Sequence, residues 1–246
     1  MSSTDSRTRD CLALIFASFF PLAMTFIYFV VLHDPQDKAN PLFMTAFTSG
    51  KIVQFLFPLA YVWWFEREQI RLAWPTRNGI ALGAGFGLAV AASMFLLFYL
   101  VVRHIPAVAE DSPRMIYERL VQFQARTPAR FLLLAIYICI PHSLWEEYYW
   151  RWFVFGWMRR YMPVSAAIAL SSIAFMLHHV VILVVYFPGN TWTLAVPFSL
   201  GVAIGGAVWA WLYERTGSLY APWLSHALID AAIMAIGFWM LREYWN

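Results

Sequence analysis

Seven long apolar stretches constrain this chain more than any other feature of its sequence. A helix needs about 20 mostly apolar residues to cross the hydrocarbon core of a bilayer. The stretches of that length cover residues 11–32, 41–65, 79–102, 131–152, 164–187, 194–213 and 219–241. Only 13% of the residues are charged, whereas a soluble domain averages about 25%. The sequence therefore predicts one all-α integral membrane domain over residues 1–246, a bundle of seven or eight transmembrane helices around a polar intramembrane cavity.

The basic residues between these stretches indicate the orientation of the chain, because cytoplasmic loops carry the excess of Lys and Arg. With seven spans, Lys38 and Arg242 fall on one side of the membrane. The other side receives Arg7, Arg9, Arg67, Arg71, Arg77, Arg159, Arg160 and Arg215. We therefore predict a cytoplasmic N-terminus, with residues 11–32 kept as a span rather than removed as a signal peptide. The short loops favour a bacterial or archaeal cytoplasmic membrane.

Residues 103–130 form the only long polar segment, and its arginines lie on the side with few other basic residues. Ser112 and Pro113 are typical of the N-cap and first turn of a helix. Apolar residues then share one face of that helix: Ile116, Leu120 and Phe123. Arg119 and the other charged side chains are expected on the remaining faces. This pattern predicts an amphipathic interfacial connector, and an eighth span is the alternative.

Four local features predict how the apolar helices pack and bend. Two rows of glycines at four-residue spacing allow close approach of a neighbouring helix: Gly79, Gly83 and Gly87, then Gly201 and Gly205. Pro141 is expected to interrupt its helix, since proline removes a backbone hydrogen bond. Lys51 is expected near the true start of its span, with its ammonium group reaching the membrane interface.

The segment Ser143–Trp152 places three charged residues inside an apolar stretch, in the order Glu146, Glu147 and Arg151. A charge at the bilayer centre costs roughly 2.5–3.5 kcal/mol. Glu147 and Arg151 are four residues apart, so a helix brings them to one face within pairing distance. Glu146 points about 100° away from that pair. Three such groups require partners, a polar cavity or a function.

Two further apolar stretches carry ionisable side chains. His178 and His179 lie in one of them, and His226 and Asp230 lie four residues apart in another. A carboxyl group in apolar surroundings is poised for general-base chemistry near neutral pH. Histidines can polarise a carbonyl group and stabilise the oxyanion that forms on attack. These groups would suffice for hydrolysis of a peptide bond by water.

The three clusters resemble the motifs of the CPBP family, which includes the CAAX prenyl endopeptidases and the Abi-type bacteriocin-processing proteins. The matching patterns are Glu146-Glu147-x-x-x-Arg151, Phe175-x-x-x-His179 and His226-x-x-x-Asp230. The motif-bearing core covers about residues 131–241. The resemblance implies a glutamate-dependent intramembrane protease with a membrane-anchored protein or peptide as substrate.

The resemblance also implies a role for each matched position. Glu146 would activate water with help from His179, and His226 with Asp230 would form the oxyanion site. The supporting residues would be Glu147 and Arg151, paired with each other or with the substrate. Many relatives have asparagine at the position of Asp230. An ionised Asp230 cannot donate a hydrogen bond, so it must be protonated or act by holding His226.

Several alternatives to this interpretation stay open. Glu147 and Arg151 could be a purely structural pair, and His178 is expected to pack rather than act directly. The expected cofactor is none, but a zinc ion could bind His142, Glu146, His179 and His226. The function could instead be release of a prenylated C-terminal tripeptide, proton-coupled transport or an inactive scaffold. The expected partners are the substrate and the lipid bilayer, and no basic run indicates nucleic acid.

Overall fold

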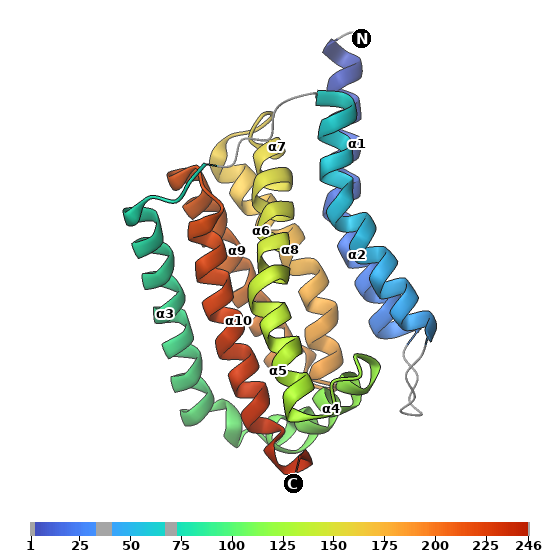
Figure 1. Ribbon diagram of the computed structural model, residues 1–246, viewed down its shortest axis with the longest axis vertical. Coiled ribbons are helices and arrows are strands. Elements are labelled where there is room, and N and C mark those ends of the chain that lie inside the picture. The colour runs from blue at the N-terminus through green and yellow to red at the C-terminus, as the bar shows by residue number, and fades with distance from the viewer. Residues whose placement is uncertain (1–2, 33–40, 67–72, 246) are drawn as a thin grey trace.

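The computed structural model describes residues 3–32, 41–66 and 73–245, and every regular element within these ranges is helical (Figure 1). Seven helical segments there are long and apolar enough to cross a membrane: Ser6–Val31, Pro41–Glu66, Arg77–His104, Pro128–Met158, Val164–Tyr186, Thr191–Thr216 and Tyr220–Met240. They coincide with the seven predicted stretches, so the all-helical membrane fold is confirmed. The described ranges contain no eighth segment of this kind. Three of the basic residues used to predict the orientation lie outside the described residues: Lys38, Arg67 and Arg71.

The helices form a bundle whose two chain ends lie at opposite ends of the molecule (Figure 1). Helices α1 (Ser3–Phe26) and α2 (Pro41–Tyr61) run antiparallel along one side. Helix α3 (Arg77–Leu100) lies on the opposite side, against α10 (Tyr220–Met240). The remaining long helices, α8 (Val164–Tyr186) and α9 (Val196–Thr216), pack against each other and against α1 and α10 respectively. Short π-helical turns extend α1, α2 and α9: Ile27–Val31, Val62–Glu66 and Thr191–Ala195.

The first glycine row brings α3 into direct backbone contact with α10, as predicted. A Cβ atom built on Gly83 would lie 2.3 Å from the carbonyl oxygen of Ala221. A Cβ atom on Gly87 would lie 3.0 Å from the Cα atom of Ser225. Because Ser225 precedes His226, this close packing fixes the part of α10 that carries the predicted site residues.

We expect Gly83→Ala to lower the free energy of unfolding by about 1–3 kcal/mol, because the added methyl group overlaps a backbone carbonyl. Gly85→Ala is the matched control on the same helix, since a Cβ atom there meets nothing within 4 Å. That control should be neutral or slightly stabilising, as alanine favours helix over glycine. Reversible unfolding in mixed micelles measures both variants. Equal stability of the two would contradict the close contact.

The second glycine prediction is wrong. A Cβ atom on Gly201 would meet nothing within 4 Å, and one on Gly205 would meet only Trp209 of the same helix. The contact with α8 is made by Gly206, whose Cβ atom would lie 3.3 Å from the Phe175 ring. Successive residues on a helix are rotated by about 100°, so the four-residue spacing marked a face adjacent to the real interface.

The helix Pro128–Met158 contains π-helical turns at and after Pro141. Its segments are α5 (Pro128–Tyr137), η5 (Ile138–His142), α6 (Ser143–Glu147), η6 (Tyr148–Phe155) and α7 (Gly156–Met158). Side chains bond to the carbonyl groups beside Pro141: the Ser143 hydroxyl donates to Cys139 at 2.6 Å, and the Trp223 indole donates to Ile140 at 3.0 Å. At the predicted interruption the helix therefore widens into a π-helical turn, which changes the direction in which the following side chains point.

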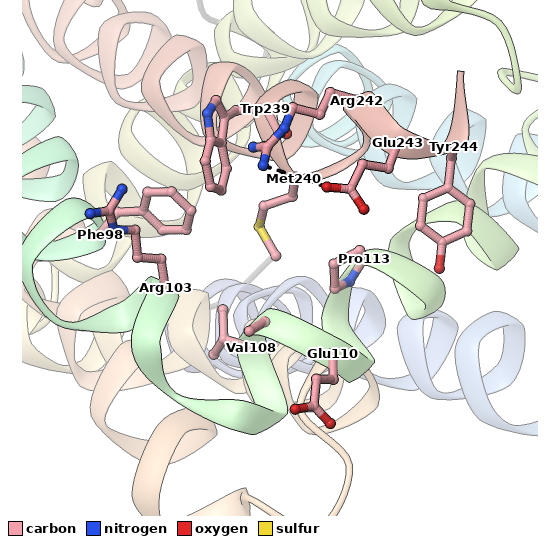
Figure 2. A pocket seen from close by; sticks show the side chains of 11 residues that line it. Phe98, Arg103, Val108, Glu110, Pro113, Trp239, Met240, Arg242, Glu243 and Tyr244 are labelled. Atoms are coloured by element: carbon pink, nitrogen blue, oxygen red, sulfur yellow. Dashed lines mark hydrogen bonds and ion pairs between the residues drawn. The ribbon is translucent and has the colours of Figure 1, made fainter. Parts of the chain in front are cut away.

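The connector between α3 and α5 contains η3 (Val102–His104), η4 (Ala107–Asp111) and α4 (Ser112–Gln122). Its apolar face packs as predicted, with Leu120 in a cluster that includes Ile116 and Phe123. Ser112 does not cap the helix, because helical turns already begin at Ala107 and the Ser112 hydroxyl donates to the Ala107 carbonyl. Figure 2 shows that Arg103 and Val108 of this connector face the end of α10.

The prediction that Arg119 lies on an exposed polar face of α4 is wrong. Its side chain is buried at 3% exposure, and its guanidinium lies 5.6 Å from the centre of the Phe29 ring. Burial lowers the pKa of this guanidinium. The π-face of Phe29 supplies a partial compensation for the buried charge. Helix α4 packs against α8 and α10. Arg119 would be solvated on an isolated helix, but this packing places it inside the bundle.

A polar network joins α1 and α2 to the end of α7. Arg9 pairs with Glu66 at 2.6 Å, and Arg160 pairs with the other oxygen of Glu66 at 2.8 Å. The buried Asp10 accepts hydrogen bonds from the hydroxyl groups of Tyr61 and Tyr161. Burial and the bond to Asp10 raise the pKa of Tyr161 to about 12, so this hydroxyl keeps its proton. The network holds α2 in register beside the helix that carries Glu146.

Candidate active site

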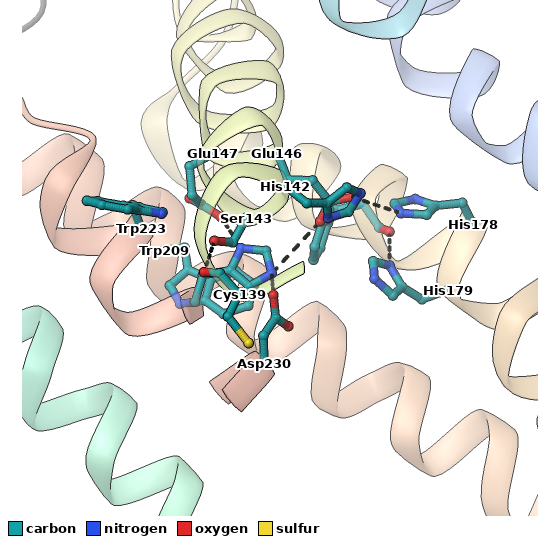
Figure 3. Close-up of polar contacts among 12 residues, drawn as sticks. Cys139, His142, Ser143, Glu146, Glu147, His178, His179, Trp209, Trp223 and Asp230 are labelled. Atoms are coloured by element: carbon teal, nitrogen blue, oxygen red, sulfur yellow. Dashed lines mark hydrogen bonds and ion pairs between the residues drawn. The ribbon is translucent and has the colours of Figure 1, made fainter. Parts of the chain in front are cut away.

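Glu146 lies in α6 with 4% exposure, and imidazole groups from three elements face its carboxylate (Figure 3). Its Oε1 atom lies 3.7 Å from Nε2 of His142 and 3.9 Å from Nε2 of His178. Its Oε2 atom lies 3.8 Å from Nε2 of His226. These distances exceed a direct hydrogen bond, and contacts of this length are typically bridged by water. The bundle thus gathers an acid and three imidazoles at one point within the membrane-spanning segments.

Glu147 connects two neighbours through its two carboxylate oxygens. Its Oε1 atom lies 2.8 Å from Nδ1 of His226, and its Oε2 atom lies 3.0 Å from Nε of Arg151. Both carboxylate and guanidinium are fully buried. The pair with Arg151 is the contact predicted from four-residue spacing. The contact with His226 joins α6 to α10 and links the structural pair to the imidazole beside Glu146.

Aromatic rings enclose the Arg151 guanidinium. Its carbon atom lies 4.8 Å from the centre of the Phe175 ring and 5.3 Å from that of Trp209. The Nε–Oε2 contact with Glu147 is an ion pair rather than a well-aligned hydrogen bond, and within the described ranges Nη1 and Nη2 also have no hydrogen-bond partner. Cation–π attraction therefore adds to the ion pair in holding this buried charge.

The His226 ring is fixed from several sides. Trp209 stacks on it with ring centres 4.1 Å apart and planes within 17°, and the Trp209 indole donates to Ser225 at 3.0 Å. Asp230, one helical turn further along α10, places Oδ2 3.6 Å from Nε2 of His226. Nε2 therefore faces both Glu146 and Asp230, whereas Nδ1 faces Glu147. The two ring nitrogens of His226 therefore face different carboxylates.

The two adjacent histidines of α8 lie in different surroundings. His178 stacks on Trp150 with planes within 4°, and its Nε2 atom faces Glu146. The Nδ1 atom of His179 lies 2.9 Å from the Phe175 carbonyl oxygen. In the part of the chain that the structure describes, the close contact from α8 to Glu146 is made by His178 rather than His179. The motif pattern alone gave no signal for this, because neighbouring residues on a helix point to different faces.

Lys51 lies well inside its span, so its predicted position at the start of that span is wrong. Helix α2 begins at Pro41, and ten residues at about 1.5 Å each place Lys51 roughly 15 Å along it. Its ammonium group lies 5.3 Å from the centre of the Phe55 ring, which meets the His142 ring edge-on at 6.3 Å. Lys51 also interacts electrostatically with Glu146. The signal in the sequence was a lysine amid a long apolar run, which is rare without a function.

The sequence leaves open a zinc ion bound by His142, Glu146, His179 and His226. In the described residues, no three His, Cys, Asp or Glu side chains are grouped so that they could hold a metal ion.

The fold and these contacts define a polytopic helical membrane protein with carboxylates and imidazoles buried at the middle of its spans. Residues 128–232 match the family described as type II CAAX prenyl endopeptidase Rce1-like. The match covers the segment that carries the three motifs and confirms the resemblance seen in them: residues 128–232 are similar to membrane peptidases of the CAAX-protease type. No curated protein and no solved structure is significantly similar to the chain.

Proposed function

We propose that this protein is an intramembrane endopeptidase that hydrolyses a membrane-proximal peptide bond with water activated by Glu146. The observation that supports this most directly is the position of the Glu146 carboxylate, less than 4 Å from imidazole nitrogens of His142, His178 and His226. Water held in these gaps would lie against a base and beside potential hydrogen-bond donors.

In the proposed reaction, Glu146 takes a proton from water as the water oxygen attacks the carbonyl carbon. The oxyanion that forms accepts a hydrogen bond from Nε2–H of His226. Since Nδ1–H of His226 donates to Glu147, donation from Nε2 requires a ring that carries both protons. The C–N bond then breaks, and Glu146 returns its proton to the leaving amine. The products are one carboxyl and one amino terminus.

The other predicted residues receive supporting roles in this proposal. Glu147 orients His226 through Nδ1, and Arg151 compensates the charge of Glu147. Asp230 stabilises the doubly protonated ring from the Nε2 side, which suits an ionised carboxylate better than donation to the oxyanion. His179 keeps its proposed role of holding water, because the Phe175 carbonyl engages Nδ1 and leaves Nε2 available. His178 is added to this role by its contact with Glu146.

The proposed substrate is a membrane-anchored protein or peptide, because the reacting groups lie within the spans rather than at their ends. Removal of a C-terminal sorting segment is the reaction we favour, and release of a prenylated C-terminal tripeptide is the variant suggested by the family. We also propose a prokaryotic cytoplasmic membrane with a cytoplasmic N-terminus, from the distribution of arginines. No metal is required by this chemistry.

Reconstitution in liposomes with two reporters tests the proposal. One reporter is a single-span protein with a C-terminal sorting helix, and the other is a peptide with a prenylated C-terminus. We expect mass spectrometry to find one new membrane-proximal cleavage in the first reporter, with a rate insensitive to chelators. Cleavage of only the prenylated peptide would instead assign prenylated C-termini as the substrate. Intact reporters in the presence of folded protein would contradict the proposed activity.

A further inference from the structure

A cavity of about 330 Å³ lies at the end of the bundle that is opposite to the N-terminus, where α3 and α10 finish. Figure 2 shows side chains of both helices and of the connector pointing toward it. Its lining includes Phe98, Arg103, Glu110, Trp239, Arg242 and Glu243. None of these belongs to the candidate active site, and Met240 of the lining is ten residues beyond Asp230, about 15 Å along α10. The volume is large enough for a small polar group.

Two guanidinium groups on the cavity wall are held by aromatic rings. Arg103 lies 5.2 Å from the centre of the Tyr99 ring, and Arg242 lies 3.9 Å from that of Trp239. Arg103 donates Nε–H to Nε2 of His104 at 3.2 Å, and Arg242 donates from Nη1 to the Trp239 carbonyl at 3.3 Å. The remaining N–H groups of each stacked guanidinium are available to an anion. Paired N–H groups of arginine match the oxygens of a phosphate group. The cavity thus presents two phosphate-type donors from the ends of two different helices.

Two carboxylates balance these cations. Glu243 lies beside Arg242, with 3.6 Å between Oε1 and Nη2, and both side chains are largely exposed. Glu110 comes from the connector on another wall of the cavity (Figure 2). In the part of the chain that the structure describes, Glu110 makes no ion pair. A ligand with both a negative and a positive group would satisfy this arrangement, whereas a net anion would meet two carboxylates.

The cavity lies at the ends of two candidate membrane spans, where lipid headgroups are expected. Arg103 belongs to the last turn of the span Arg77–His104, and Arg242 follows the end of the span Tyr220–Met240. The rings of Phe98 and Trp239 meet edge-on at 5.3 Å and give the cavity an apolar side. Exposed leucines continue along α3 from there, where acyl chains would lie: Leu96, Leu97 and Leu100. Arginine and tryptophan at span ends are typical of contact with the membrane interface.

We propose that this cavity binds the headgroup of phosphatidylethanolamine, a lipid with one phosphate and one primary ammonium group. The phosphate lies between Arg103 and Arg242, and the ammonium group donates hydrogen bonds to Glu110 and Glu243. Phosphatidylcholine carries a quaternary ammonium group that has no N–H to donate. Phosphatidylglycerol carries a net negative charge. The site therefore distinguishes three common phospholipids by hydrogen bonding and charge, independently of the proposed peptidase activity.

Native mass spectrometry of the whole protein in detergent tests this assignment by titration with each of the three lipids. We expect one phosphatidylethanolamine to bind at least about tenfold more tightly than the others, a factor that one additional charge-assisted hydrogen bond can supply. The double variant R103Q/R242Q should lose this affinity by a similar factor. Millimolar inorganic phosphate should not displace the lipid. Displacement by phosphate would assign the cavity to a soluble anion and overturn the lipid proposal.

Two further variants test whether the effect is specific to the cavity. R215Q is the matched control, since Arg215 is an exposed arginine 5.6 Å from the Trp211 ring at the other end of α9–α10, and its lipid affinity should equal that of the wild type. E110Q/E243Q should retain phosphate contacts but bind phosphatidylcholine and phosphatidylethanolamine equally. Unchanged affinity in R103Q/R242Q, or an unchanged preference in E110Q/E243Q, overturns the proposal. Thermal unfolding of each variant checks that the fold is retained.

Discussion

Replacement of Glu146 by glutamine is expected to lower the rate of reporter cleavage by about 10²–10⁴-fold, the contribution of a positioned general base. Glutamine keeps the size of the side chain and can still accept a hydrogen bond, but it cannot take a proton from water. The imidazoles of His142, His178 and His226 would remain in place around it. Single-turnover cleavage in liposomes measures the loss directly.

The matched control for this substitution is Glu118→Gln. Glu118 lies on α4 in a partly exposed pair with Arg114, separated by 3.8 Å, and it is outside the candidate active site. Its replacement removes the same charge and should leave cleavage unchanged. Circular dichroism and thermal unfolding distinguish a lost base from a lost fold. A Glu146→Gln protein that is folded and cleaves at the wild-type rate would remove Glu146 from the mechanism.

Replacement of Arg151 by methionine is expected to lower the free energy of unfolding by about 3–5 kcal/mol, the cost of leaving a buried charge without its partner. The guanidinium and the Glu147 carboxylate are both fully buried at 3.0 Å. Methionine fills much of the same volume between Phe175 and Trp209 but supplies no positive charge. Equilibrium unfolding in mixed micelles, followed by tryptophan fluorescence, measures the change.

The double variant E147Q/R151M tests whether charge is the cause. It removes both members of the pair, so it should be more stable than Arg151→Met alone. Arg215→Met is the control for loss of an exposed arginine stacked on an aromatic ring, and it should change stability by less than about 0.5 kcal/mol. A double variant less stable than the single one would show that packing, rather than the unpaired charge, dominates at this position.

The seven spans could be predicted from the sequence because the bilayer imposes a minimum length on every apolar helix. The pair of Glu147 and Arg151 could be predicted because both residues belong to one helix and its period brings them together. The close approach at Gly83 and Gly87 followed from a row of small residues on one face. Each of these features is determined by the sequence of a single helix and by the lipid that surrounds it.

The features that could not be predicted depend on which neighbour a helix face meets. The bond between Glu147 and His226 joins residues 79 positions apart, and only the packing of α6 against α10 creates it. The burial of Arg119 and the contact of Gly206 depend on the rotation of α4 and α9 about their axes. The position of Lys51 near Glu146 likewise requires α2 to pack beside the helix Pro128–Met158. Motif spacing contains none of this information.

A comparison of single and double variants tests the central claim most directly, namely that Glu146 and His226, from separate helices, act together in one hydrolytic step. Single-turnover cleavage rates are needed for Glu146→Gln, His226→Gln and the combined variant. Residues that act as a unit lose their effect together, so we predict that the combined variant cleaves at about the rate of the slower single variant. Losses that multiply would mean that Glu146 and His226 contribute independently, and that result would contradict a shared site.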